Sequence, residues 1–260
     1  MSASNVTATW FDPLPIAHYA QLVETNLPGP KEKVVRPPNP TIGTPKIEVS
    51  CGPNIRYLGC LEDGKPNYRA SILIVTKGEV PQTPTMTYII GPANKADSEA
   101  GKLLNGEFPV TKVDTVDEYT FWRFNVELQL TAYEQKIKYA INDEFNPDFQ
   151  FFIPAVDQSM NAMSYSCNGF SINVDVDEFP GCLWLDVLRK HDQLHYHVML
   201  GGGDQIYCDA IKFVSKEFEK WLKHKRPHNT LTPELDASFK QFYLNHYMEW
   251  FGVDPTSQHL

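Results

Sequence analysis

A run of three glycines followed by an acidic and a phenolic residue marks the segment "HVMLGGGDQIYCDA", residues 197–210. Glycines after an apolar stretch let the backbone turn sharply and approach a ligand. Asp204 and Tyr207 are three residues apart, so a helical turn there would place both side chains on one face. A carboxylate and a phenolate are hard, anionic ligands suited to Fe(III), Mn or Ca. The spacing favours equally the simpler interpretation that Asp204 caps a helix and Tyr207 packs in a core.

Cys167, in "SYSCNGF", is the second candidate ligand. It follows a short predicted strand, and the next strand, "YHVML", which we expect to be buried, runs into the glycines. Between them, "CLWLDVLRKHD" has helical spacing at Leu183, Trp184, Val187 and Leu188. A strand–helix–strand crossover makes the two strands parallel, so Cys167 would lie beside Asp204 at their carboxyl ends, where ligands bind in open α/β sheets. Taken alone, a cysteine is more often a small buried apolar residue.

The elements after the glycines are predicted to be helical. A stripe of apolar residues runs through "AIKFVSKEFEKWLKHKR" at Ile211, Val214, Phe218, Trp221 and Leu222, and Pro227 stops it. Thr232 can cap a last helix that has Pro233 at its first position. Its apolar face is formed by Leu235, Phe239, Phe242, Tyr243, His246 and Trp250, and Gly252 can close it.

A different pattern precedes this region. Residues 1–44 are rich in proline and predict an arm laid over a domain or a tether. Residues 45–155 alternate apolar and polar residues, most clearly in "WRFNVELQL" and again in "KIKYAI", with further strands at "YRASILIVTKG" and "TMTYIIG". Several short strands separated by Gly, Pro, Asn and Asp clusters predict an antiparallel β-sandwich, immunoglobulin- or fibronectin-like.

The composition limits the classes of function. A net charge of -9 argues against nucleic-acid binding, which favours a basic surface. No apolar run approaches the roughly 20 residues that span a bilayer, and no secretory signal is apparent. Five cysteines, an odd number without a CxxC pair, fit a reducing compartment. We therefore expect a cytoplasmic protein.

"SYSCNGF" followed by "LWLDVLRKHDQLHYHVMLGGGDQIYCDAI" resembles the PhoD-like metallophosphoesterases, particularly their fungal multi-domain group. The resemblance extends over about residues 45–260. It implies that residues 156–260 form part of a metallophosphoesterase α/β domain, so that the fold would be α+β or α/β, with the β-sandwich preceding the catalytic part. It implies an iron bound by Cys167, Asp204 and Tyr207, with calcium or another divalent metal as its companion. The activity implied is hydrolysis of phosphate monoesters or diesters.

This sequence departs from the family pattern after the aspartate motif. The family continues to a "WDDHD"-like segment and later Asp/His motifs, which supply the remaining ligands, and none is present here. The pair His195 and His197 precedes the aspartate motif, so we interpret it as strand packing rather than a metal site. We expect a fragment or shortened product with weak or absent catalysis. The alternative is a non-catalytic β-sandwich module for protein or peripheral membrane contacts, with a vestigial phosphatase segment.

Overall fold

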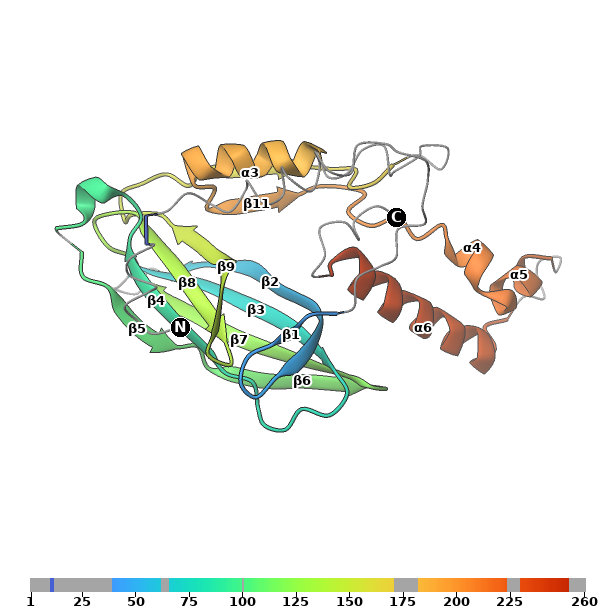
Figure 1. Ribbon diagram of the computed structural model, residues 1–260. Helices are drawn as coiled ribbons and strands as arrows, with labels where there is room; N and C mark the ends of the chain where they lie inside the picture. The colour runs from blue at the N-terminus through green and yellow to red at the C-terminus, as the bar shows by residue number, and fades with distance from the viewer. Residues whose placement is uncertain are drawn as a thin grey trace, which may run out of the picture.

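The computed structural model describes residues 10–11, 39–61, 66–99, 101–170, 182–223 and 230–252. Its larger part consists of two antiparallel sheets (Figure 1). The first has the order β1-β2-β3-β7-β6 and is formed by β1 (Thr41–Ile42), β2 (Ile47–Leu61), β3 (Asn67–Lys77), β6 (Val110–Val116) and β7 (Tyr119–Gln129). The second has the order β5-β4-β8-β9 and is formed by β4 (Met86–Pro92), β5 (Leu104–Glu107), β8 (Gln135–Ile141) and β9 (Glu144–Ile153). A 3-10 turn, η1 (Lys95–Asp97), lies between β4 and β5.

The two sheets share one apolar core. Ile72 and Phe124 reach it from the five-stranded sheet, and Ile137 and Ile153 reach it from the four-stranded sheet. Buried residues alternate along β7, as the period of two predicted, because successive side chains of a strand point to opposite faces. The prediction of a β-rich, antiparallel fold is therefore confirmed. Its relationship to immunoglobulin or fibronectin domains, and the domain boundaries, stay predictions.

A strand–helix–strand unit follows, made of β10 (Ala162–Tyr165), α3 (Cys182–Leu194) and β11 (Val198–Gly201). The two strands pair in parallel, from Ala162 opposite Val198 to Tyr165 opposite Gly201, as the crossover predicted. The rings of Tyr165 and Trp184 meet edge-to-face at 5.1 Å, which holds α3 against the pair. The assignment of this unit to an α/β metallophosphoesterase domain stays a prediction.

β11 is not buried, so that prediction was wrong. Met199 is 49% exposed and Leu200 is 54% exposed. An apolar sequence predicts burial only where other elements cover both faces of the strand. Among the described residues, β11 pairs with β10 alone, and its apolar side chains stay accessible.

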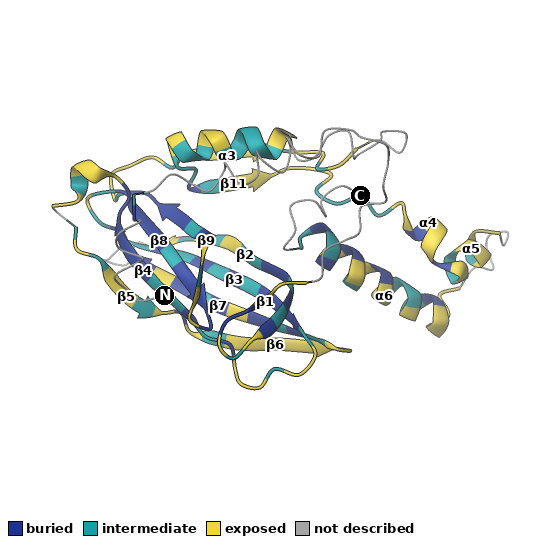
Figure 2. Cartoon of the chain, in the orientation of Figure 1, coloured by how far each residue is buried: buried dark blue, intermediate teal, exposed yellow. Residues whose placement is uncertain are grey.

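The helix predicted from Ala210 is divided into α4 (Ile211–Val214) and α5 (Lys216–Lys223). Ser215 causes the break, because its backbone is extended and its Oγ accepts a hydrogen bond from the Phe218 N–H at 3.0 Å. Of the predicted stripe, Ile211 is buried, whereas Val214 is 67% exposed. Figure 2 shows how much of α4 and α5 is exposed. The predicted stop at Pro227 lies outside the described residues.

The last helix, α6 (Pro233–Trp250), begins as predicted: Thr232 Oγ1 accepts from the Leu235 N–H at 3.2 Å, and Pro233 is the first residue. Its carboxyl end packs on the outer face of the five-stranded sheet through Met248, beside Cys51 and Val75. The Cys51 thiol donates to the Phe251 carbonyl at 3.1 Å. No described helix is long and apolar enough to cross a bilayer.

Of the proline-rich arm, only Trp10 and Phe11 are described. Trp10 is 2% exposed and packs with Ile89 on the outer face of the four-stranded sheet. Its indole N–H donates to the Pro92 carbonyl at 2.9 Å, and the Lys136 ammonium lies 5.1 Å from the ring centre. At these two residues, the arm lies over the sheet, which is one of its two predicted arrangements.

Candidate functional site at the ends of β10 and β11

The parallel pairing of β10 and β11 brings Cys167 to Asp204. Beyond the last strand pair, the Cys167 N–H donates to the Gly203 carbonyl at 3.0 Å, and the Asn168 N–H donates to the Asp204 carbonyl at 2.9 Å. The Cys167 thiol points at Oδ2 of Asp204 across 3.7 Å. Both residues lie at the carboxyl ends of their strands, as ligand-binding residues do in open α/β sheets.

Cys167 and Asp204 both have left-handed backbones, with φ values of 55° and 57°. This conformation costs free energy in a residue with a side chain, and such strained residues are concentrated at functional sites. Gly202 permits the close approach of the two loops, because a Cβ there would lie 3.3 Å from the Tyr165 carbonyl oxygen. The glycine run therefore allows the two side chains to face each other.

Tyr207 completes the group, although by a different local structure from the one predicted. Residues 205–206 form a bend, and no helical turn joins Asp204 to Tyr207. Burial, a hydrogen bond with the Cys167 side chain, and the charges of Cys167 and Asp204 raise the pKa of the Tyr207 phenol. His246 of α6 holds the Tyr207 backbone, with its Nε2 2.7 Å from the Tyr207 carbonyl oxygen. The alternative in which Asp204 caps the following helix is wrong, since α4 has Ala210 at its N-cap and no side-chain cap.

Gly169 gives the Tyr207 ring its place. A Cβ at position 169 would lie 2.6 Å from Cδ2 of Tyr207 and 3.5 Å from the Trp250 ring. We expect Gly169→Val to lower the free energy of unfolding by about 1 to 2 kcal/mol, because the added atoms overpack this contact. Urea denaturation measures the change. Gly203→Ala is the matched control, since a Cβ on Gly203 meets nothing within 4 Å; equal losses in both variants would contradict the expectation.

The donor set fits one metal ion in part. Metal–sulfur and metal–oxygen bonds of about 2.3 and 2.1 Å at a tetrahedral ion separate sulfur and oxygen by about 3.6 Å. The separation between Cys167 Sγ and Asp204 Oδ2 is 3.7 Å, so both can reach one ion, and the Tyr207 phenol beside Cys167 is a third donor once a metal displaces its proton. Across the described part of the chain, no three His, Cys, Asp or Glu side chains group closely enough to hold a metal. The set is thus suited to one ion with open positions, not to a complete multi-metal centre.

Comparisons with known proteins show a similarity to one family. Residues 128–255 match the model described as PhoD related phosphatase. This segment is similar to that family. The chain is also 39% identical over 221 residues to the uncharacterized protein YGR266W of Saccharomyces cerevisiae, an alignment that covers 80% of this chain and 30% of the yeast protein. The resemblance expected from the sequence is confirmed, and the chain spans less than a third of this relative's length.

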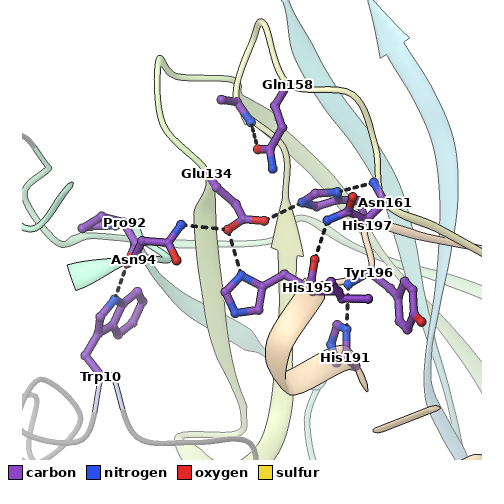
Figure 3. Close-up of polar contacts among 12 residues, drawn as sticks. Trp10, Pro92, Asn94, Glu134, Gln158, Asn161, His191, His195, Tyr196 and His197 are labelled. Atoms are coloured by element: carbon purple, nitrogen blue, oxygen red, sulfur yellow. Dashed lines mark hydrogen bonds and ion pairs between the residues drawn. The ribbon is translucent and has the colours of Figure 1, made fainter. Parts of the chain in front are cut away.

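The PhoD-related segment, residues 128–255, begins within β7 and so includes Glu134, a residue that the sequence patterns did not single out. Glu134 lies between β7 and β8, and its side chain is 7% exposed. Its Oε2 is 2.8 Å from Nδ1 of His195, and its Oε1 is 2.8 Å from Nε2 of His197 (Figure 3). Asn94 also donates to Oε2, at 3.1 Å. The prediction of strand packing for these two histidines was wrong, because both precede β11 and bind one carboxylate.

The electrostatics of this Glu134 cluster follow from its burial. Burial raises the pKa of Glu134, but hydrogen bonds from His195 and His197 outweigh it and lower the pKa to about 2. The pKa of His191 is lowered to about 4, mainly by burial and to a smaller extent by the charges of the nearby His195 and His197. His191 accordingly accepts a hydrogen bond at Nδ1, from the Tyr196 N–H at 2.9 Å. At neutral pH the cluster therefore contains an ionised glutamate and a neutral His191.

Proposed function

We propose that this chain is part of a metal-dependent phosphoesterase that hydrolyses phosphate monoesters or diesters. The observation that supports this best is the convergence of Cys167, Asp204 and Tyr207 at the ends of two parallel strands. A carboxylate, a thiol and a phenol together form a set of groups that binds iron once the thiol and the phenol lose their protons. They meet here within a segment that matches a family of PhoD related phosphatases.

In this proposal Cys167, Asp204 and Tyr207 hold one metal, iron by the family resemblance, and calcium or another divalent ion is its companion. Bound there, a metal supplies a Lewis acid for a phosphate oxygen and lowers the pKa of water. The chain's own part is placement. The left-handed backbones of Cys167 and Asp204 aim the two donors, and His246 fixes the Tyr207 backbone.

We propose that the other ligands lie outside the described residues. The yeast relative is much longer than the aligned region, and β11 exposes Met199 and Leu200 where parallel strands are ordinarily covered. We include in the proposal that additional chain of a longer protein of this kind covers β11 and completes the site.

The direct test is metal binding by the chain itself. We expect titration with Fe(III), supplied as its citrate complex, to load about one ion per chain and to produce the visible absorption of a phenolate–Fe(III) bond. Elemental analysis after gel filtration measures the stoichiometry. Turnover of p-nitrophenyl phosphate is assayed alongside, with weak activity expected because the ligand set is incomplete. A chain that retains no Fe(III), Mn(II) or Ca(II) would remove the support for this proposal.

A second candidate function is that of an interaction module, and the exposed apolar residues of α4 favour it. Phe213 is 78% exposed and Val214 is 67% exposed. Large apolar side chains exposed next to each other are typical of contact surfaces. This function needs no metal, so it predicts that Asp204→Asn leaves partner binding unchanged in a pull-down from the native cell. Loss of that binding with the fold intact would count against it.

A further inference from the structure

The Glu134 cluster joins the β-sandwich to the strand–helix–strand unit. Glu134 belongs to the loop between β7 and β8, whereas His197 immediately precedes β11, 63 residues further along the chain. The side chain of His197 is fully buried and that of Glu134 is 7% exposed. The sandwich holds Glu134 in turn, since the Ala93 N–H donates to its carbonyl at 2.8 Å and Asn94 donates to its carboxylate. A buried polar contact of this length is well placed to fix one part of the molecule on the other.

The hydrogen bonds of His197 define its protonation. Its Nδ1 lies 2.9 Å from the Asn161 N–H, which can only donate, so Nδ1 is an acceptor without a proton. The ring proton is therefore on Nε2, and it is donated to Oε1 of Glu134. The His197 N–H also donates to the Asn161 carbonyl at 2.9 Å. His197 thus binds the N–H of Asn161 through its ring and the C=O of Asn161 through its backbone.

Asn161 and His197 are the residues directly ahead of the first strand pair, Ala162 opposite Val198. Their double contact sets which residue of β10 lies opposite which residue of β11. The pair needs such a constraint, because it contains only four residues in each strand. A slip of one residue would turn every side chain to the opposite face of the strand. At the other end, the same slip would separate Cys167 from Asp204.

We propose that Glu134 and His197 are positioning residues that fix the register of β10 and β11 and thereby place Cys167 beside Asp204. Glu134 orients the His197 ring from the rigid sandwich, and His197 transmits that position to Asn161. The inference rests on the proposed function only for what the positioned residues do; the placement itself does not depend on a metal or a phosphate ester.

His195 offers a matched comparison. Its Nδ1 binds the other oxygen of the same carboxylate at 2.8 Å, and its ring stacks on Phe152 at 4.0 Å. Within the described contacts, however, its ring makes no hydrogen bond to β10 or β11. Loss of His195 therefore weakens the cluster without releasing the register, whereas loss of His197 does both.

The test measures the proximity of positions 167 and 204 through a disulfide bond. Asp204→Cys is made in a chain whose Cys60, Cys182 and Cys208 are replaced by serine. Oxidised glutathione is added as the two-electron oxidant, and the rate of intramolecular disulfide formation is followed by mass spectrometry. Adding His197→Phe is expected to slow the reaction about tenfold, whereas adding His195→Phe changes it less than twofold. Circular dichroism and urea unfolding check that the sandwich remains folded.

Equal rates in the His197→Phe and His195→Phe chains, whether both slow or both fast, would overturn the proposal. If His197→Phe does not fold, His197→Lys takes its place, because lysine keeps a donor for Glu134 and has no acceptor for the Asn161 N–H. The same tenfold slowing is expected, and an unchanged rate overturns the proposal. Failure of metal binding alone contradicts only the proposed function, since the disulfide forms without metal.

Discussion

Glu134→Ala is expected to lower the free energy of unfolding by about 3 kcal/mol at pH 7. The change removes the acceptor for three donors, from Asn94, His195 and His197, in a place where water does not replace it. Each buried donor left without a partner costs about 1–3 kcal/mol. Urea denaturation at constant pH measures the loss, and Glu107→Ala, at an exposed position of β5, is the control.

The same substitution has a pH signature. Because the folded pKa of Glu134 is about 2, against an ordinary 4.5, the carboxylate stabilises the fold fully above pH 4.5 and loses this effect as the pH falls toward 2. The natural chain should have the larger free energy of unfolding, and its difference from Glu134→Ala should therefore shrink by about 2 kcal/mol between pH 4.5 and pH 3. His191 contributes separately: its pKa of about 4 lies below the usual 6.5, so its stabilisation is lost as the pH falls from 6.5 to 4.

A difference between the two chains that stays constant from pH 7 to pH 3 would contradict this account of Glu134. It would mean that the lost stability comes from packing and not from an ionised carboxylate. An equal loss of unfolding free energy in Glu107→Ala would likewise show that the hydrogen bonds of Glu134 do not explain its effect.

Local sequence patterns predicted the elements that carry the candidate site. The parallel placement of Cys167 and Asp204 follows from the order strand–helix–strand, whereas the alternation in β7 and the capping of α6 by Thr232 follow from short-range rules. Those rules act on neighbours in the chain, where the spacing of side chains is fixed by the backbone.

The features that were not predicted depend on distant partners. Glu134 finds His195 and His197 more than 60 residues away, and nothing in its own neighbourhood indicates them. β11 has a buried-strand sequence, yet it is exposed, because burial depends on what other elements cover it. Ser215 was predicted to lie within a helix, but its hydroxyl competes for the Phe218 N–H and starts a new helix.

Asp204 is the position where the candidate metal site is most open to test. We expect Asp204→Asn to weaken Fe(III) binding at least a hundredfold, because the change removes one of three anionic donors and leaves an amide. Asparagine is the right replacement, since it tolerates the left-handed backbone that Asp204 adopts at a φ of 57°. Alanine would add backbone strain to the loss of charge and confuse the two effects.

Stability should behave differently from metal binding at this position. Asp204 is exposed, so without metal Asp204→Asn should change the free energy of unfolding by less than about 0.5 kcal/mol. Asp209→Asn is the control for charge, because its exposed carboxylate pairs with Lys212 at 2.7 Å instead of facing Cys167. Fe(III) affinity should stay within twofold in that variant. If Asp204→Asn binds Fe(III) as the natural chain does, Asp204 is not a ligand; if both variants lose affinity equally, the effect is one of net charge and not of a site.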